Sequence, residues 1–417
     1  MIRQDEPNFE GVLLDAKTIP QEHLNIDNKE RSNLFPWNGQ FSPQLIETIL
    51  RTYASAGSVV LDPFLGSGTV LHESGRLGYS AFGSEVNPAA FKMAEIYRFI
   101  NAKPARRKNV VSDADAIIRE SLPAAPSLFS PGKQLSIPLH EVLSNEAKKV
   151  DDKPVRTLLE VLVVLLNFGD HELTPDSVLS TWVKLQQTVR DLPYSESLIE
   201  PTNADARALP IADQRADIVI TSPPYINVFN YHQQYRRSVE SLGWDLLEVA
   251  RSEIGSNRKH RGNRFLTVIQ YCIDMKAVLD ELRRVCKPGA RIIVVVGRES
   301  NVRKTKFFNG EIVARLAVQS AGYRLLSRQE RVFQNRFGDM IYEDILHLTP
   351  VQPYTVGTPA KEIAGETLVA AIERAPAESL NDLKSALEKL ADVSPSPLYD
   401  SRSALTVGQA QKFKEVV

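Results

Sequence analysis

The stretch VVLDPFLGSGTV, residues 59–70, decides the fold. It joins an apolar run that ends at Asp62 to a turn that contains Gly66 and Gly68, and a helical pattern follows. SAFGSEVNP (80–88) is again typical of a strand, and a second helical pattern covers 89–102. Strands that alternate with helices form parallel sheets, so this part of the chain predicts an α/β fold.

The same alternation returns in the second half of the chain. RADIVITSPPY (215–225) and ARIIVVVG (290–297) are typical of buried strands, and helical patterns cover 266–289 and 310–323. Residues 323–333 and 339–350 predict a closing antiparallel pair. Residues 104–200 interrupt the alternation with a Pro/Ser-rich stretch and helical patterns.

These patterns divide the chain into five segments. We expect an extended N-terminal arm, two halves of one α/β domain, a mostly helical insertion that is a candidate target-recognition region, and a C-terminal tail that is partly helical or disordered. The arm covers 1–33 and the tail covers 351–417. The insertion covers 104–200 and separates the two halves of the α/β domain, which cover 34–103 and 201–350.

Composition excludes several classes of protein. The 417 residues carry a formal net charge of −1, so any nucleic-acid partner must be held by local basic patches. The two cysteines form neither a disulfide framework nor a zinc motif, so no metal site is expected. The N-terminus lacks the apolar core of a signal peptide, and the apolar run 158–168 is too short to cross a bilayer. A cytoplasmic protein without a membrane anchor is the natural expectation.

The turn after Asp62 favours a nucleoside pocket. Glycines at 66 and 68 let the backbone approach a ligand closely, and Glu85 follows the next strand, where a carboxylate can bind both ribose hydroxyls. The turn lacks the lysine of a phosphate-binding loop, and Leu71 replaces the third glycine of a dinucleotide fingerprint. An acidic turn repels a pyrophosphate but suits a sulfonium, so S-adenosylmethionine is favoured over NAD or ATP.

Plainer interpretations of these acids stay open. Asp62 and Glu85 are also explained as caps at strand ends. Asp205 follows another strand-like segment, where its carboxylate or backbone could meet the adenine amino group, or where it is only an exposed turn residue.

TSPPY, residues 221–225, raises a different question about chemistry. The exocyclic amine of cytosine or adenine is a poor nucleophile because its lone pair is delocalised into the ring. The Ser222 hydroxyl and the Pro223 carbonyl could accept its hydrogens from a rigid turn, and Tyr225 offers a face on which an extruded base can stack. The alternative is a simple strand stop with a core tyrosine.

DPFLGSGT (62–69) followed by TSPPY (221–225) resembles the S-adenosylmethionine-dependent amino-methyltransferases of DNA, the N4-cytosine and N6-adenine enzymes. The resemblance covers roughly 35–100 and 200–348 and implies a Rossmann-like seven-stranded sheet flanked by helices. The implied catalytic residues are Ser222, Pro223, Pro224 and Tyr225. The implied cofactor residues are Asp62, Pro63, Phe64, Gly66, Ser67, Gly68, Thr69 and Glu85, with Phe41 and Pro43 of FSPQL as a looser match.

The resemblance also implies a reaction and partners. Methyl transfer to N4 of cytosine is favoured over N6 of adenine, because a serine-first tetrapeptide is commoner among N4-cytosine enzymes. Double-stranded DNA is the expected substrate, and the target base is expected to be flipped out of the duplex. A cognate restriction endonuclease or a defence-system subunit is a candidate partner. The alternatives are an RNA base amino-methyltransferase and a non-catalytic subunit that binds S-adenosylmethionine and DNA.

A basic loop directly downstream supplies candidates for contact with DNA. SEIGSNRKHRGNR (252–264) could contact phosphates, or it could be a solvated charge run. Amides and aromatics before it suit base edges and stacking, or a packed helix surface. The candidate DNA-binding residues are Asn227, Tyr231, Arg258, Lys259, Arg261 and Arg264. PARRK (104–108) and RKTK (303–306) are further candidates for phosphate contacts.

Overall fold

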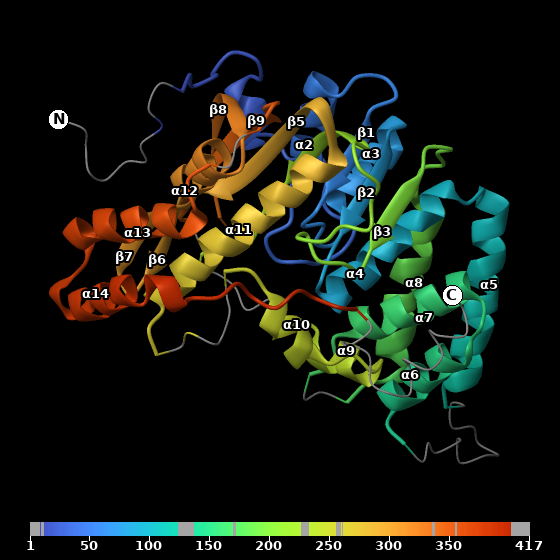
Figure 1. Ribbon diagram of the computed structural model, residues 1–417. Coiled ribbons are helices and arrows are strands. Elements are labelled where there is room, and N and C mark those ends of the chain that lie inside the picture. Colours follow the sequence, from blue (N-terminus) through green and yellow to red (C-terminus); the bar gives the residue numbers. More distant parts are fainter. Residues whose placement is uncertain are drawn as a thin grey trace, which may run out of the picture.

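A computed structural model gives the fold (Figure 1). It describes residues 9, 12–123, 137–169, 172–226, 233–255, 260, 262–335, 338–354 and 357–401. Across this part of the chain, every helix falls short of the length and hydrophobicity that a membrane crossing requires.

A seven-stranded sheet forms the centre of the molecule, in the order β3-β2-β1-β4-β5-β9-β8. The first five strands in this order run parallel, and β9 is antiparallel to both of its neighbours. The expected Rossmann-like sheet is therefore confirmed, including the closing antiparallel pair. The strands are β1 (Val59–Asp62), β2 (Ser80–Ser84), β3 (Ile199–Thr202), β4 (Ala216–Thr221), β5 (Cys286–Gly297), β8 (Tyr323–Gln334) and β9 (Met340–Pro350).

Alternating apolar side chains of the central strands serve two separate cores. Val60 packs with the helices that follow β1 and β2, whereas its neighbour Leu61 packs with the later helices. Apolar side chains on both faces of a strand are what a sheet covered on both faces requires. One core holds α2 (Pro43–Tyr53), α3 (Thr69–Leu77) and α4 (Pro88–Glu95), and the other holds α11 (Phe265–Val285), α12 (Asn309–Arg315) and α13 (Ala360–Ala371).

The insertion is helical, as expected. It contains α5 (Pro104–Ser121), α6 (Leu139–Lys149), α7 (Lys153–Leu166) and α8 (Pro175–Asp191), and it extends the first core. Arg107 is buried and donates to the carbonyls of Ala102 and Pro193, at 2.8 and 2.7 Å. It is thereby committed to structure rather than to a phosphate. The expected boundary at 200 falls inside β3, which is an edge strand of the sheet.

The N-terminal segment is more closely packed than the expected extended arm. It contains α1 (Gln21–Asn25), and Ile19 and Leu24 are buried. Arg331 of β8 donates from Nε to the Leu24 carbonyl at 2.8 Å. The arm therefore follows the outer edge of the sheet instead of extending into solvent.

The C-terminal segment also differs from the expected loose tail. Its described part contains α13 and α14 (Leu380–Glu388), which pack against α11 through buried Leu368 and Leu383. An extended segment, residues 394–400, then runs back across the molecule (red in Figure 1). We call these residues the C-terminal strap. Its contacts with the site are described below.

Among the remaining described elements are two short helices, a helical turn and a second sheet. The helices are α9 (Arg236–Ser241) and α10 (Leu246–Ser252), with a helical turn at Leu316–Ser320 that continues α12. The second sheet pairs β6 (Glu299–Val302) with β7 (Thr305–Phe308) and directly follows β5. The turn of this small sheet carries the RKTK stretch, where Arg303 pairs with Asp382 and Lys304 with Glu378. Both cations thus bind the C-terminal helices.

Candidate active site

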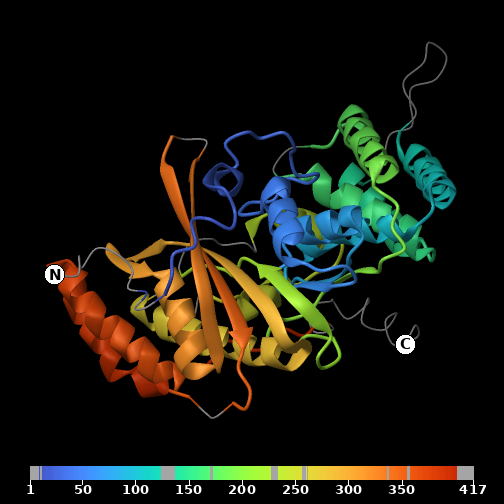
Figure 2. The same ribbon diagram turned by 90° about the horizontal axis from the view of Figure 1, so that it is seen from above.

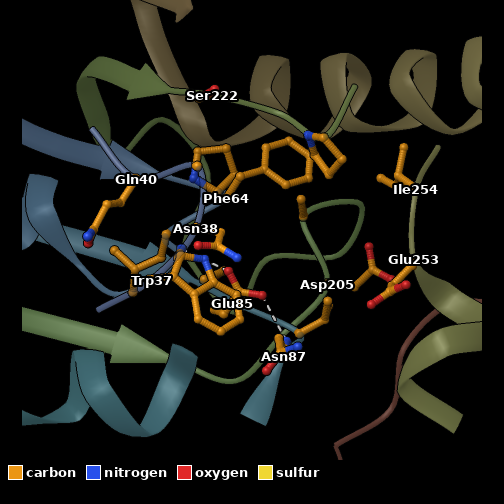
Figure 3. Close-up of a pocket in the computed structure, with 18 of the residues that line it drawn as sticks. Trp37, Asn38, Gln40, Phe64, Glu85, Asn87, Asp205, Ser222, Glu253 and Ile254 are labelled. Carbon is orange, nitrogen blue, oxygen red and sulfur yellow. Dashed lines mark hydrogen bonds between the residues drawn. The ribbon is translucent and has the colours of Figure 1, made fainter. Parts of the chain in front are cut away.

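A pocket lies at the carboxyl ends of the parallel strands (Figure 3). This edge is where α/β sheets bind ligands. Six chain segments line the pocket, from the loop before α2 to the end of α10. They contribute residues 37–41, 63–66 with Thr69, 84–87, 205–206, Ser222 with Pro224, and 252–254.

The glycine turn faces the pocket with only one of its glycines. Gly66 lines the pocket at φ +52°, and a Cβ there would lie 3.3 Å from the Trp37 indole. Gly68 does not line it. At φ +96°, a Cβ on Gly68 would lie 2.5 Å from the Tyr97 ring. Our expectation that Gly68 admits the cofactor is therefore corrected, because its missing side chain makes room for Tyr97.

Asp62 supports the pocket from below and is not one of the residues that line it. It is buried, and it accepts hydrogen bonds from the Thr221 hydroxyl at 2.7 Å and the Phe64 amide at 3.1 Å. Burial raises the pKa of Asp62 to about 7. The carboxyl thus connects the end of β1 to the end of β4 and holds the start of the turn. We expected it to contact the cofactor directly, but it lies outside the pocket lining.

Glu85 lines the pocket and binds two backbone amides of the neighbouring lining. Its two carboxylate oxygens accept from the Gly66 and Asn87 amides, each at 2.8 Å. Burial raises the pKa of Glu85 to about 7, and the nearby Glu253 carboxylate acts in the same direction. The carboxylate is therefore placed where a ligand that donates hydrogen bonds would favour its charged form.

Asp205 also lines the pocket, but its carboxylate is already engaged. Arg207 donates to it from Nε at 2.9 Å and from Nη2 at 2.7 Å, and the Tyr399 amide donates at 2.9 Å. Of the two ways in which we expected Asp205 to meet an adenine, the structure favours the backbone.

The C-terminal strap completes this wall of the pocket. Arg207 donates to the carbonyls of Ser396 and Pro397 at 2.9 and 2.8 Å, and the Tyr399 hydroxyl donates to Asn203 at 2.7 Å. Asn203 in turn donates to the Glu85 carbonyl at 2.7 Å. The strap therefore connects through Arg207 to the Asp205 carboxylate and through Asn203 to the backbone of Glu85.

The loop before α2 contributes residues that the sequence did not single out. Trp37, Asn38, Gly39 and Gln40 line the pocket beside Phe41. Ser67 does not line the pocket; its hydroxyl is 2.7 Å from the Gln40 side-chain oxygen. Pro43 begins α2 and lines a larger neighbouring groove instead. The Asn-Gly pair in WNGQ was the one signal that a turn lies here.

A second group of unexpected residues comes from the end of α10. Ser252, Glu253 and Ile254 line the pocket opposite the glycine turn. Sequence reasoning assigned Ser252 to the start of a basic loop that contacts DNA. Its position in the structure instead places this short stretch against the cofactor side of the site.

The SPPY turn lies between the pocket and the larger groove. Ser222 and Pro224 line the pocket, and Ser222 and Tyr225 line the groove, whose volume is about 1330 Å³. The hydroxyl oxygens of Ser222 and Tyr225 are 3.3 Å apart. Pro223 is buried and lines neither. Ser222 thus has access to both spaces.

Most of the candidate DNA-binding residues cannot be placed. Asn227, Tyr231, Arg258, Lys259 and Arg261 lie outside the described residues. Arg264 is half-buried immediately before α11.

Comparison with known proteins agrees with this geometry. A family model described as DNA methylase matches residues 5–96. The Type II methyltransferase M.BsoBI of Geobacillus stearothermophilus is 22% identical over 74% of this chain and 81% of its own length. The resemblance to the DNA amino-methyltransferases is confirmed. The Type II methyltransferase M.MjaII of Methanocaldococcus jannaschii is 33% identical over 17% of this chain and 14% of its own.

Solved structures show more distant likeness to this methyltransferase. A protein from Methanosarcina mazei described as a SAM-dependent methyltransferase is 12% identical, covers 73% of this chain and 97% of its own, and gives a TM-score of 0.35. TrmN from Thermus thermophilus is 14% identical and gives a TM-score of 0.30, and the match covers 75% of this chain and 50% of TrmN. At such scores the fold assignment rests on the strand order itself.

S-adenosylmethionine is the cofactor of the methyltransferase, and the pocket fits it. Among the described residues that line the pocket are Glu85, Asp205 and Glu253, and neither lysine nor arginine lines it. Arg207 balances Asp205 from behind, so Glu85 and Glu253 carry the acidic character of the lining. Such a charge balance suits a cation and opposes a phosphate. Phe64, Pro224 and Ile254 supply apolar walls for a nucleoside.

Proposed function

We propose that this chain transfers a methyl group to an exocyclic amine of a base at specific sites in double-stranded DNA. N4 of cytosine is the first choice of target and N6 of adenine the second. The observation that carries the proposal is the position of Ser222, which lines both the cofactor pocket and the groove. The match to the DNA methylase model and the similarity to M.BsoBI support DNA as the substrate.

The SPPY turn supplies the acceptors that an amine needs. Its serine hydroxyl and the carbonyl of Pro223 accept hydrogen bonds from the two N–H groups of the amine, and so favour a tetrahedral nitrogen with a localised lone pair. The turn is rigid because both prolines fix φ, so these acceptors cost little reorganisation. S-adenosylmethionine supplies an electrophilic methyl group on a sulfonium when it is bound.

Tyr225 positions the base. Its ring lies against Gly297 at the end of β5, where a Cβ would approach Cε2 of the ring to 2.9 Å. The missing side chain of Gly297 therefore leaves room for the Tyr225 ring. An extruded base that stacks on this ring presents its amine to Ser222, which is held three residues away in the same turn.

The tetrapeptide favours one base over the other without excluding the second. Serine in its first position supports N4 of cytosine through the family resemblance, and the same acceptors suit N6 of adenine. We also propose that the enzyme acts in the cytoplasm, beside a cognate endonuclease or as part of a defence system. The candidate DNA-binding residues, Arg264 among them, remain part of this proposal.

Expression in a host without DNA methylation of its own tests the proposal. Sequencing of the host DNA by a method that reports modified bases should show N4-methylcytosine at one short motif. N6-methyladenine at one motif would keep the DNA methyltransferase and change the base. Tight binding of S-adenosylmethionine without modified DNA would overturn the proposal and favour an RNA substrate or a non-catalytic subunit.

A further inference from the structure

We propose that the β8–β9 hairpin reads the target sequence by entering the major groove of the DNA. The inference rests on the proposed function, since it needs duplex DNA in the groove beside Tyr225. It assigns target reading to an element other than the helical insertion that the sequence suggested. Four features of the described structure carry it.

The first feature is the length of the hairpin beyond the sheet. Glu343 is the last residue of β9 that pairs with β5, opposite Gly297. Beyond it, Met340 still pairs with Gln334 of β8. At about 3.4 Å per residue, the paired ribbon extends ~10 Å past the end of β5. Figure 2 shows it projecting alone from the sheet. A two-stranded ribbon of this kind fits the major groove of DNA, which is about 12 Å wide.

The second feature is the connection between the hairpin and the catalytic turn. Both line the same groove, which runs from Ser222 and Tyr225 to the hairpin tip. Gly297 touches the Tyr225 ring and pairs with Glu343 at the root of the hairpin. Because base pairs stack about 3.4 Å apart, a tip ~10 Å from this point reaches bases within about three pairs of a base stacked on Tyr225.

The third feature is the chemistry of the tip. Met340 and Tyr342 are 51% and 45% exposed, although both are large and apolar over most of their surface. Gln334 and Asn335 stand beside them in the groove lining. Amides read adenine edges, and apolar side chains contact the thymine methyl group. Arg298 holds the root of this face: it pairs with Glu330 at 2.9 Å and lies 5.2 Å from the centre of the Tyr342 ring.

The fourth feature is the charge of the groove and the position of the insertion. The described groove lining contains five basic residues and three acidic ones, a balance of +2 in a chain of net charge −1; they are Lys29, Arg298, Lys306, Arg328 and Arg331 against Glu299, Glu330 and Glu343. Lys306 forms an exposed ion pair with Glu299, at 3.1 Å, which a phosphate can replace at small cost. Within the described residues, the insertion contributes nothing to this lining. It joins the opposite edge of the sheet, through β3.

A pair of matched variants tests the assignment. The hairpin variant is Met340→Ala with Tyr342→Ala, and the control is Val183→Ala, an equally exposed apolar residue on α8 of the insertion at 57%. Both are surface changes, so both should leave the melting temperature and the affinity for S-adenosylmethionine unchanged. The assay follows transfer of a labelled methyl group from S-adenosylmethionine to unmethylated genomic DNA. Sequencing of the product DNA then identifies the modified motif.

We expect the hairpin variant to lose about ten-fold or more in kcat/KM for DNA, and to relax the motif within three pairs of the modified base. The control should match the wild type in both. A hairpin variant with wild-type rate and motif would overturn the inference, as would a loss confined to the control. The proposed function is judged separately, by whether the wild type modifies DNA at all.

A second measurement examines the phosphate contacts. Lys29→Ala should weaken binding to random-sequence duplex DNA and reduce the salt slope by about one counterion. An unchanged slope would remove this side of the groove from the DNA interface.

Discussion

Replacement of Gly68 by alanine separates two explanations of the glycine turn. If Gly68 is needed for close approach of the cofactor, Gly68→Ala should weaken S-adenosylmethionine binding and leave stability alone. The structure gives the opposite expectation, because a Cβ at this position would lie 2.5 Å from the Tyr97 ring and 3.2 Å from the Ala94 side chain.

Two costs add in Gly68→Ala. A left-handed conformation costs a residue with a side chain about 1–2 kcal/mol, and an extra methyl group in a packed core costs about 1–3 kcal/mol. The variant should therefore lose ~2–5 kcal/mol in the free energy of unfolding. Gly78→Ala is a matched control, because Gly78 has φ +81° and nothing within 4 Å of its Cβ position. It should lose only the first of these two costs.

Urea unfolding followed by tryptophan fluorescence measures both variants, and calorimetric titration measures their affinity for S-adenosylmethionine. The difference between the two variants, about 1–3 kcal/mol, is the overlap with Tyr97. A third variant that combines Gly68→Ala with Tyr97→Leu should recover part of it. Equal destabilisation by Gly68→Ala and Gly78→Ala would refute the reasoning, as would a folded Gly68→Ala protein that no longer binds the cofactor.

Three substitutions and one pH dependence test the site. Tyr225→Ala should reduce methyl transfer at least ten-fold and leave cofactor affinity intact, and equal turnover would remove the base-stacking role. Burial raises the pKa of Asp62 and of Glu85 to about 7 in the folded protein. The folded state therefore binds more protons than the unfolded state between about pH 4 and 7, so the stability that these two groups contribute is fully present below pH 4 and is lost by about pH 7. Urea midpoints should fall across that range. Cofactor binding near pH 6.5 should release a proton that Glu85→Gln does not release, as read from calorimetry in buffers of different ionisation enthalpy; equal release would assign the proton elsewhere. Tyr399→Phe should cost about 1 kcal/mol in stability and raise the KM for S-adenosylmethionine while kcat stays constant, and a fall in kcat alone would argue against a positioning role.

The sequence predicts those features of the fold that local patterns determine. Buried strands, the glycine turn and the helices around them follow from apolar periodicity, and the strand order agrees with the family resemblance. β6 and β7 were missed because each has four residues and their turn is rich in lysine and arginine. A strand of only four residues gives no alternation long enough to detect.

The site was predictable where one segment makes a turn, and not where distant segments meet. Phe64, Gly66 and Glu85 line the pocket as their motif suggested. Nothing in the sequence near Asp205 indicates that Arg207 occupies its carboxylate, or that residues some 190 positions later complete the same wall. Such contacts depend on how the whole chain packs, so no short window contains them.

The C-terminal strap makes the cofactor pocket a junction between the two ends of the described chain. Trp37 and its neighbours form one wall, and Ser396, Pro397 and Tyr399 support the other. During synthesis, Ser396, Pro397 and Tyr399 follow Trp37 only after some 350 further residues have been made. A nascent chain should therefore acquire its affinity for S-adenosylmethionine near the end of synthesis of the described chain. Once the cofactor is bound, its binding free energy protects the loop before α2 and the strap together against local opening, although the two lie at opposite ends of the described sequence.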